Sequence, residues 1–164
     1  MNEFNAEEVL EIACQIERNG VRFYTRASEL VSSPEARKML NILASMEAEH
    51  ERFFDGLRGD NGLLESLSLE SEGEAVKYLR AIASGKVFPS DVDPSSELSD
   101  AVTLTQVLRK AIEMEMASIA FYQGIREVFP AGGDGSKVEH VIREEMRHVT
   151  MLTEKLFVEE TATR

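Results

Sequence analysis

The sequence has a single cysteine, Cys14, and no tryptophan. One thiol cannot build an internal disulfide framework or a four-cysteine metal module, so Cys14 is interpreted as a small buried hydrophobic residue. No apolar run approaches the roughly 20 residues of a membrane-spanning helix. The acidic start of the chain also lacks the basic residues and apolar stretch of a signal peptide. We therefore expect a cytoplasmic protein with no membrane partner.

Basic residues are scarce as well, with 18 Lys and Arg against 30 Asp and Glu, which gives a net charge of -12. Binding to a nucleic-acid backbone needs clustered Lys and Arg, so nucleic acid is excluded as a partner and cations are favoured. The 164 residues, 43% hydrophobic and 29% charged, predict one globular domain over residues 1–164.

Helical periodicity dominates what is present, and it predicts four long helices. Each helix has a capping signal at its start. The signals are Asn5 with Glu8, Ser33 followed by Pro34, Thr103 with Gln106, and Ser136 with Glu139. The predicted helices span about 6–30, 34–56, 104–128 and 137–158.

The connections constrain how these helices pack. Short turns near 31–33 and 130–135 predict two antiparallel hairpins. The connection 57–102 is long, is rich in Gly and Pro, and contains one predicted short helix around 72–83. Helices of about 25 residues are roughly 38 Å long, so a return along the bundle needs such a crossover. The predicted fold is therefore an all-α, ferritin-like four-helix bundle of two hairpins joined by a long crossover.

An internal repeat relates the two hairpins. A glutamate followed by a Phe-Tyr pair in the first helix recurs 98 residues later in the third, and a Glu-x-x-His motif in the second helix recurs at the same offset in the fourth. The repeated polar residues are Glu17, Glu47 and His50 in the first half and Glu115, Glu145 and His148 in the second. The pattern predicts a site of near-twofold symmetry.

These six residues fall in the middle of the apolar stripe that each helix is expected to bury. Residues three apart share a helix face, so each Glu-x-x-His directs a carboxylate and an imidazole at one point. Burying four carboxylates without compensation is costly, and no Lys or Arg occupies a central position of the stripe. Two divalent ions would balance the charge. Oxygen and imidazole ligands favour iron or manganese, although a buried polar network without metal remains the alternative.

With these motifs the chain resembles the rubrerythrins and their ferritin-like di-iron relatives. The resemblance implies that Glu47 and Glu145 bridge two iron ions, that Glu17 and Glu115 bind from outside, and that each histidine completes one iron. It implies a cofactor of two irons (Fe2+/Fe3+), with manganese or a mixed pair as the alternative. Two features differ from the family: the rubredoxin-like domain is missing, and Ser118 stands where an additional glutamate is usual.

By this resemblance, the expected function is reduction of hydrogen peroxide or dioxygen in oxidative-stress defence, with a separate electron-donor protein. The alternatives are a ferroxidase that stores or transfers iron, and a structural or sensory bundle. We also expect a homodimer, because Val21, Phe53 and Ile119 lie beside the apolar stripe.

Residues near the predicted ligands allow further interpretations. Tyr24 and Tyr122 lie two turns beyond Glu17 and Glu115, and each is either a core residue or a hydrogen-bond donor to a ligating carboxylate. His140 has no glutamate three residues before it and is not expected to be a ligand. The other acids nearby are expected on solvated helix faces. They are Glu49, Glu51, Glu113 and Glu144.

Overall fold

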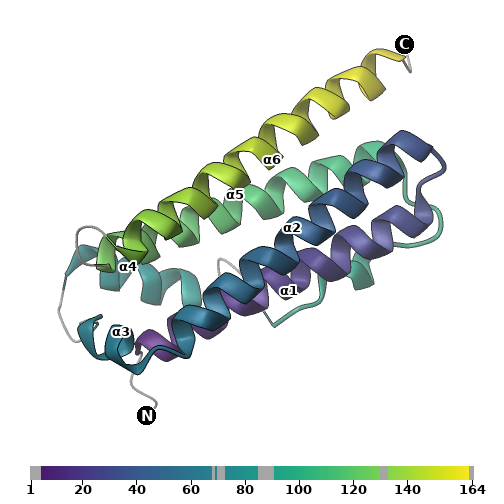
Figure 1. Cartoon of the computed structure of the whole chain (residues 1–164). Helices are drawn as coiled ribbons and strands as arrows, with labels where there is room; N and C mark the ends of the chain where they lie inside the picture. The colour runs from purple at the N-terminus through teal and green to yellow at the C-terminus, as the bar shows by residue number, and fades with distance from the viewer. Residues whose placement is uncertain (1–4, 68, 70–72, 85–90, 130–132, 163–164) are drawn as a thin grey trace.

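The computed structural model describes residues 5–67, 69, 73–84, 91–129 and 133–162. Helices α1 (Ala6–Leu30) and α2 (Pro34–Arg58) form one antiparallel hairpin, and α5 (Leu104–Val128) and α6 (Asp134–Ala162) form the other (Figure 1). The described residues contain helices and no strand, which confirms the all-α prediction.

Three of the four predicted helix starts are confirmed. The side chain of Asn5 accepts a hydrogen bond from the Glu8 amide, Ser33 accepts one from the Ala36 amide, and Thr103 forms a complete capping box with Gln106. Each cap satisfies an amide that has no partner within its own helix.

The fourth predicted start is wrong by about one turn. Helix α6 begins at Asp134, so Ser136 lies inside the helix and its amide bonds to the Gly133 carbonyl. Gly133 has a φ of 55°, which lets the chain turn immediately before the helix. Helix α6 also continues to Ala162, beyond the predicted residue 158.

Helix α2 passes through the predicted end at Gly56 and stops at Arg58. Its cap residue is Gly59, whose amide bonds to the Asp55 carbonyl. A glycine inside a helix lowers stability without necessarily ending the helix, so Gly56 was a weak stop signal.

The crossover contains more helix than the sequence indicates. The predicted short helix is α4 (Glu74–Ala83), and residue 72, where its start was placed, lies outside the described residues. Two further elements, α3 (Asn61–Ser66) and the 3-10 helix η1 (Pro94–Glu97), were predicted as loop. Asp60 and Asp93 cap them through backbone amides of Leu63 and Ser95. The part of the turn before Gly133 also falls outside the described chain.

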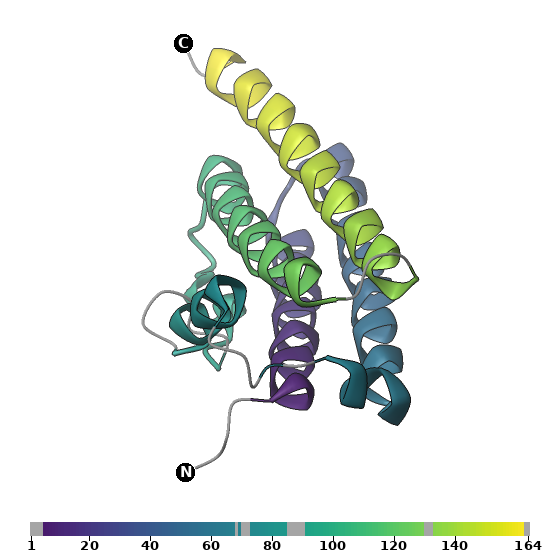
Figure 2. The ribbon, with the colours of Figure 1, turned by 90° about the vertical axis from the view of Figure 1, so that its left-hand side faces the viewer.

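The crossover covers one side of the bundle. Helix α4 packs against α5, and η1 packs against α1. Figure 2 shows these elements on the side where α1 and α5 lie, away from α2. The crossover therefore joins the two hairpins and also covers the junction between α1 and α5.

The apolar interior is divided into two clusters. One cluster surrounds Leu10, Phe54 and Phe121, and the other surrounds Phe23, Leu40 and Leu108. The predicted inward-facing stripe residues are buried, except Leu104, which is half-buried. A layer of buried glutamates and histidines lies on the same stripes, at positions between those of the two clusters in each helix.

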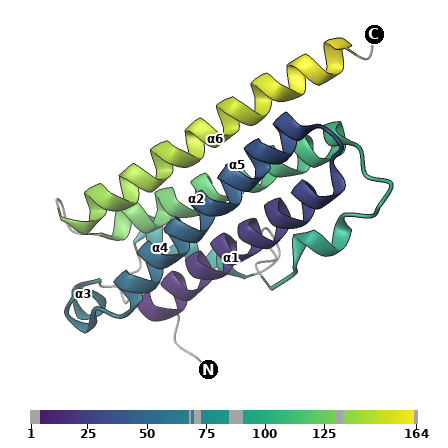
Figure 3. The same ribbon diagram turned by 45° about the vertical axis from the view of Figure 1, so that its right-hand side comes forward.

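Two of the residues expected to support dimerisation serve the chain's own core. Phe53 and Ile119 are partly buried and pack against the first apolar cluster. Exposed apolar side chains lie elsewhere, including Phe157 and Val158 near the C-terminal end of α6, the helix that runs along the top of the bundle in Figure 3. The homodimer stays a prediction. Among the described residues, none of the helices combines the length and apolar character needed to cross a membrane.

Candidate metal centre

The bundle brings all six predicted residues together in its interior. Each of the four long helices contributes: α1 and α5 give one glutamate each, and α2 and α6 give one glutamate and one histidine each. The exposed fractions are 0% for Glu17, 3% for Glu47, 4% for His50, 2% for Glu115, 0% for Glu145 and 1% for His148. This burial confirms that the six polar residues lie on the inward faces of the four long helices.

The six side chains form two overlapping groups that could hold a metal ion. Within each group one ligand atom per residue lies within 4.8 Å of the others. Both groups contain Glu47 and Glu145. Glu17 and His50 complete the first group, and Glu115 and His148 complete the second. This arrangement offers two candidate cation positions, with two carboxylates common to both.

Glu145 lies between the two imidazoles. Its Oε1 is 2.9 Å from Nδ1 of His50, and its Oε2 is 2.8 Å from Nδ1 of His148. The two imidazole rings are stacked with centroids 5.9 Å apart. Glu47 is the other shared carboxylate, with Oε1 3.3 Å from Nδ1 of His148. Both Nδ1 atoms therefore face the shared carboxylates.

Two tyrosines connect the hairpins through the outer glutamates. The Tyr24 hydroxyl of α1 donates a hydrogen bond to Glu115 of α5, and the Tyr122 hydroxyl of α5 donates one to Glu17 of α1. Burial, together with the neighbouring carboxylates, raises the pKa of both phenols well above its usual value. Each phenol thus keeps its proton and fixes one oxygen of its carboxylate. Both interpretations of these tyrosines therefore hold, because each is buried in the core and each donates a hydrogen bond to a buried carboxylate.

The prediction for Glu144 is wrong in part. Its side chain is half-buried, and its Oε2 is 3.0 Å from Nε2 of His50. The repeat concealed this contact, because the matching position in the first hairpin is Met46. Only the packing of α6 against α2 reveals it.

The other neighbouring residues need less revision. Glu49 and Glu113 are exposed, as predicted. Glu51 is half-buried, contrary to the predicted solvated face, because Arg18 pairs with it at 2.8 Å. His140 is exposed and belongs to neither ligand group, in agreement with the sequence prediction.

Without metal, the centre keeps protons on most of its carboxyl groups. Burial is the main cause that raises the pKa of Glu17 well above its usual range, and it raises those of Glu47 and Glu115 to about 8. Burial also tends to raise the pKa of Glu145. The contacts of this carboxylate with both imidazoles have the larger effect and lower the pKa to about 2.

The imidazoles carry the matching positive charge. Burial opposes ionisation of His50 and His148, yet their close carboxylate contacts raise each pKa to about 12. Protons therefore supply the positive charge that balances the buried carboxylates when metal is absent. A divalent cation at the same place would displace them.

The donor set fits two divalent ions. Among the described residues, several buried atoms that face the centre have no hydrogen-bond partner, including both oxygens of Glu145 and Nδ1 of both histidines. Within the described chain, histidine is the only partner in the salt bridges of the centre's four glutamates, which are Glu17, Glu47, Glu115 and Glu145. Carboxylate oxygens and imidazole nitrogens turned toward a common point, without a fixed cation, are suited to iron or manganese.

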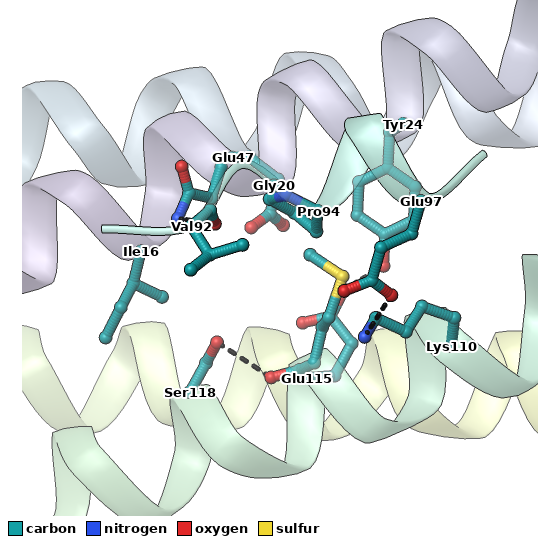
Figure 4. Close-up of a pocket in the computed structure, with 12 residues that line it drawn as sticks. Ile16, Gly20, Tyr24, Glu47, Val92, Pro94, Glu97, Lys110, Glu115 and Ser118 are labelled. Carbon is teal, nitrogen blue, oxygen red and sulfur yellow. Dashed lines mark hydrogen bonds and ion pairs between the residues drawn. The ribbon is translucent and has the colours of Figure 1, made fainter. Parts of the chain in front are cut away.

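A pocket with a volume of about 100 Å³ leads from the surface to the centre. Figure 4 shows it bordered by Glu47 and Glu115, with Val92 and Glu97 of the crossover toward its outside. Lys110 on α5 pairs with Glu97 at 2.8 Å. The pocket's other lining residues are Ile16, Asn19, Gly20, Tyr24, Pro94, Met114 and Ser118. Small molecules could therefore reach the carboxylates from the side that the crossover covers.

Small residues at two equivalent positions help to leave this space open. Gly20 and Ser118 each lie three residues after an outer glutamate and are related by the repeat. Both line the pocket. A Cβ at Gly20 would lie 2.6 Å from Oε2 of Glu47. The sequence shows that the repeat relates these two positions, but it does not predict a pocket.

Replacing Gly20 with alanine should displace the Glu47 carboxylate while the helix remains folded. The close atom is the end of a flexible side chain, so it can move away from the new methyl group. We expect metal affinity to fall by about 10- to 100-fold, as for other disturbances of ligand geometry. Isothermal titration with Co2+ measures it. Gly56→Ala, where a Cβ meets nothing within 4 Å, is the matched control and should leave affinity unchanged. Equal affinities for the two variants would contradict this.

Comparisons with known proteins agree with the fold. A protein-family model described as Rubrerythrin matches residues 8–102, which span the first hairpin and most of the crossover. The chain is also similar to the crystal structure of a protein from Thermotoga maritima described as a ferritin-like diiron-carboxylate protein, with a TM-score of 0.67 and 22% sequence identity. This similarity covers 94% of this chain and 95% of that chain, and it shows the ferritin-like fold. Comparison with curated proteins gave no match.

Proposed function

Because the chain belongs to the rubrerythrin family, we propose that it is a non-haem di-iron oxidoreductase that reduces hydrogen peroxide or dioxygen. The observation that carries this proposal is the pair of four-residue groups sharing Glu47 and Glu145. Four buried carboxylates and two imidazoles, without Lys or Arg in contact among the described residues, match two iron ions in charge and in ligand type. Within the proposal, Glu17 and His50 complete one position, and Glu115 and His148 complete the other.

Two iron ions would supply the two electrons that cleave an O–O bond. The chain's own residues then have separate tasks. Tyr24 and Tyr122 hold one oxygen of each outer glutamate, so the second oxygen remains available as a ligand. The pocket beside Gly20 and Ser118 admits a small molecule, and its limited volume excludes bulky substrates.

Reduction of hydrogen peroxide to two waters consumes two electrons and two protons. Glu47 and Glu115 line the pocket, but as metal ligands they would give up their protons when metal binds, so the protons would come from water that enters through the pocket. We propose that electrons come from a separate donor protein, because the lone Cys14 of this sequence is buried and burial raises its pKa to about 11. A thiol of this kind is a poor redox group.

The test is to mix anaerobically prepared ferrous protein with hydrogen peroxide or with dioxygen and to follow ferric absorption by stopped flow. We expect peroxide to oxidise the centre at least about tenfold faster than dioxygen at equal concentration. Glu145→Ala is the control that removes a shared ligand, and its signal should fall to that of free Fe2+. Faster reaction with dioxygen, together with many irons retained per chain, would instead support a ferritin-like ferroxidase.

A further inference from the structure

The two histidines of the centre differ in what their outer nitrogen contacts. Both Nδ1 atoms face the shared carboxylates, so both Nε2 atoms point away from the centre. Nε2 of His50 lies 3.0 Å from Oε2 of Glu144. Nε2 of His148 is buried and makes no hydrogen bond within the described part of the chain. The near-twofold symmetry of the ligands therefore stops at their outer contacts.

The sequence explains the asymmetry. Glu144 directly precedes Glu145 on α6, whereas the residue directly before Glu47 on α2 is Met46. A methionine has no carboxylate to offer a histidine. Glu144 also has neighbours of its own, since its Oε1 is 3.6 Å from His140 and 4.0 Å from Arg147. Glu144 is half-buried between these cationic or ionisable groups and His50, which favours one position of its carboxylate.

A metal on Nδ1 of an imidazole leaves the ring proton on Nε2. When that proton is donated to a carboxylate, the ring orientation is fixed and the metal-binding nitrogen becomes a stronger ligand. Loss of such an outer partner typically lowers metal affinity about 10- to 100-fold. His50 has this partner, and within the part of the chain that the structure describes His148 lacks it.

We propose that Glu144 makes the two metal positions unequal, so that the position completed by His50 and Glu17 fills before the position completed by His148 and Glu115. In this role Glu144 is a positioning residue that acts through His50. The proposal rests on the metal centre of the proposed function but not on its oxidant. Stepwise loading would leave a one-metal form of the protein over a range of metal concentrations.

Anaerobic calorimetric titration of the whole chain with Co2+ tests the proposal. We expect two binding steps in the wild-type protein, with dissociation constants about 10- to 100-fold apart. Glu144→Ala should weaken only the tighter step by a similar factor, so that the two steps merge. Glu144→Gln keeps the side-chain shape and an accepting oxygen, and it should restore part of the difference. Glu49→Ala, which removes an exposed acid next to His50 in sequence, should change neither step.

A second measurement assigns the steps to positions. The tighter Co2+ step, followed by its visible absorption, should persist in His148→Ala, whereas only the weaker step should remain in His50→Ala. Two equal steps in the wild-type protein, or equal weakening of both steps by Glu144→Ala, would overturn the proposal and leave the proposed function standing. Slow reaction with peroxide, combined with unequal Co2+ steps, would overturn the proposed function alone.

Discussion

Replacing Glu145 with alanine is expected to abolish binding at both metal positions. One oxygen of Glu145 contacts Nδ1 of His50 and the other contacts Nδ1 of His148, so a single substitution removes a ligand from both groups. Glu17 and Glu115, by contrast, each belong to one group only. Metal analysis after anaerobic loading with Fe2+ and dialysis should give about two ions per chain for the wild-type protein and none for Glu145→Ala.

The outer glutamates provide the matched controls. Glu17→Ala and Glu115→Ala each remove one carboxylate from one group, so each variant should retain about one ion per chain. Circular dichroism of the metal-free variants would establish that each remains helical. If Glu145→Ala kept as much metal as Glu17→Ala, Glu145 would not be shared, and the overlapping arrangement of the two groups would be wrong.

The stability of the metal-free protein should decrease as the pH rises from about 5 to about 9. The folded protein holds protons on Glu47 and Glu115 up to about pH 8, whereas the unfolded chain loses them near pH 4.5. The stabilisation from such a raised pKa is complete below the unfolded value and is lost as the pH passes through the folded value. His50 and His148 act in the same direction, with pKa values raised to about 12.

Glu145 has the opposite effect, but only in acid. Its pKa is lowered to about 2, so its contribution is present above about pH 4.5 and is lost as the pH falls toward 2. The unfolding free energy of the metal-free protein should therefore be greatest near pH 5. Each extra proton held by the folded state gives a slope of about 1.4 kcal/mol per pH unit.

Denaturant unfolding across this pH range measures the slope. Glu47→Gln, which cannot lose a proton, should flatten it. Divalent metal should reverse the trend, because binding displaces protons from the carboxyl groups and imidazoles, and the stability gained on adding metal should increase with pH. A metal-free protein whose stability rises between pH 5 and pH 9 would show that the buried groups do not hold protons in the folded state.

The six buried polar residues of the candidate centre could be predicted from the sequence because their positions depend on helical periodicity and on repetition. The position of Glu47 relative to His50, three residues apart on a strongly helical segment, requires both side chains to share a face. The same reasoning applies to Glu145 and His148, and the 98-residue repeat relates the two motifs. Burial of all four side chains in the structure follows from these local relations.

Errors arose where local signals were weak or were opposed by tertiary contacts. The sequence predicts loop around Asp60 and around Asp93, yet each aspartate caps a short helical element. Leu63 and Leu64 of the first element pack against the apolar core, so tertiary burial stabilises a helix too short to form alone. Ser136 had the spacing of a capping residue, but the left-handed Gly133 began the helix earlier.

By itself, the sequence determined the four long helices, the stripe that each one buries and the six polar residues on those stripes, because spacing along one helix fixes which side chains share a face. Tertiary structure alone decided which residues meet across helices: Tyr24 with Glu115, Tyr122 with Glu17, and Glu144 with His50. It also decided that the space beside Gly20 stays open under the crossover. These contacts depend on the rotation and offset of one helix against another, which result from packing of the whole interior rather than from any local pattern of residues.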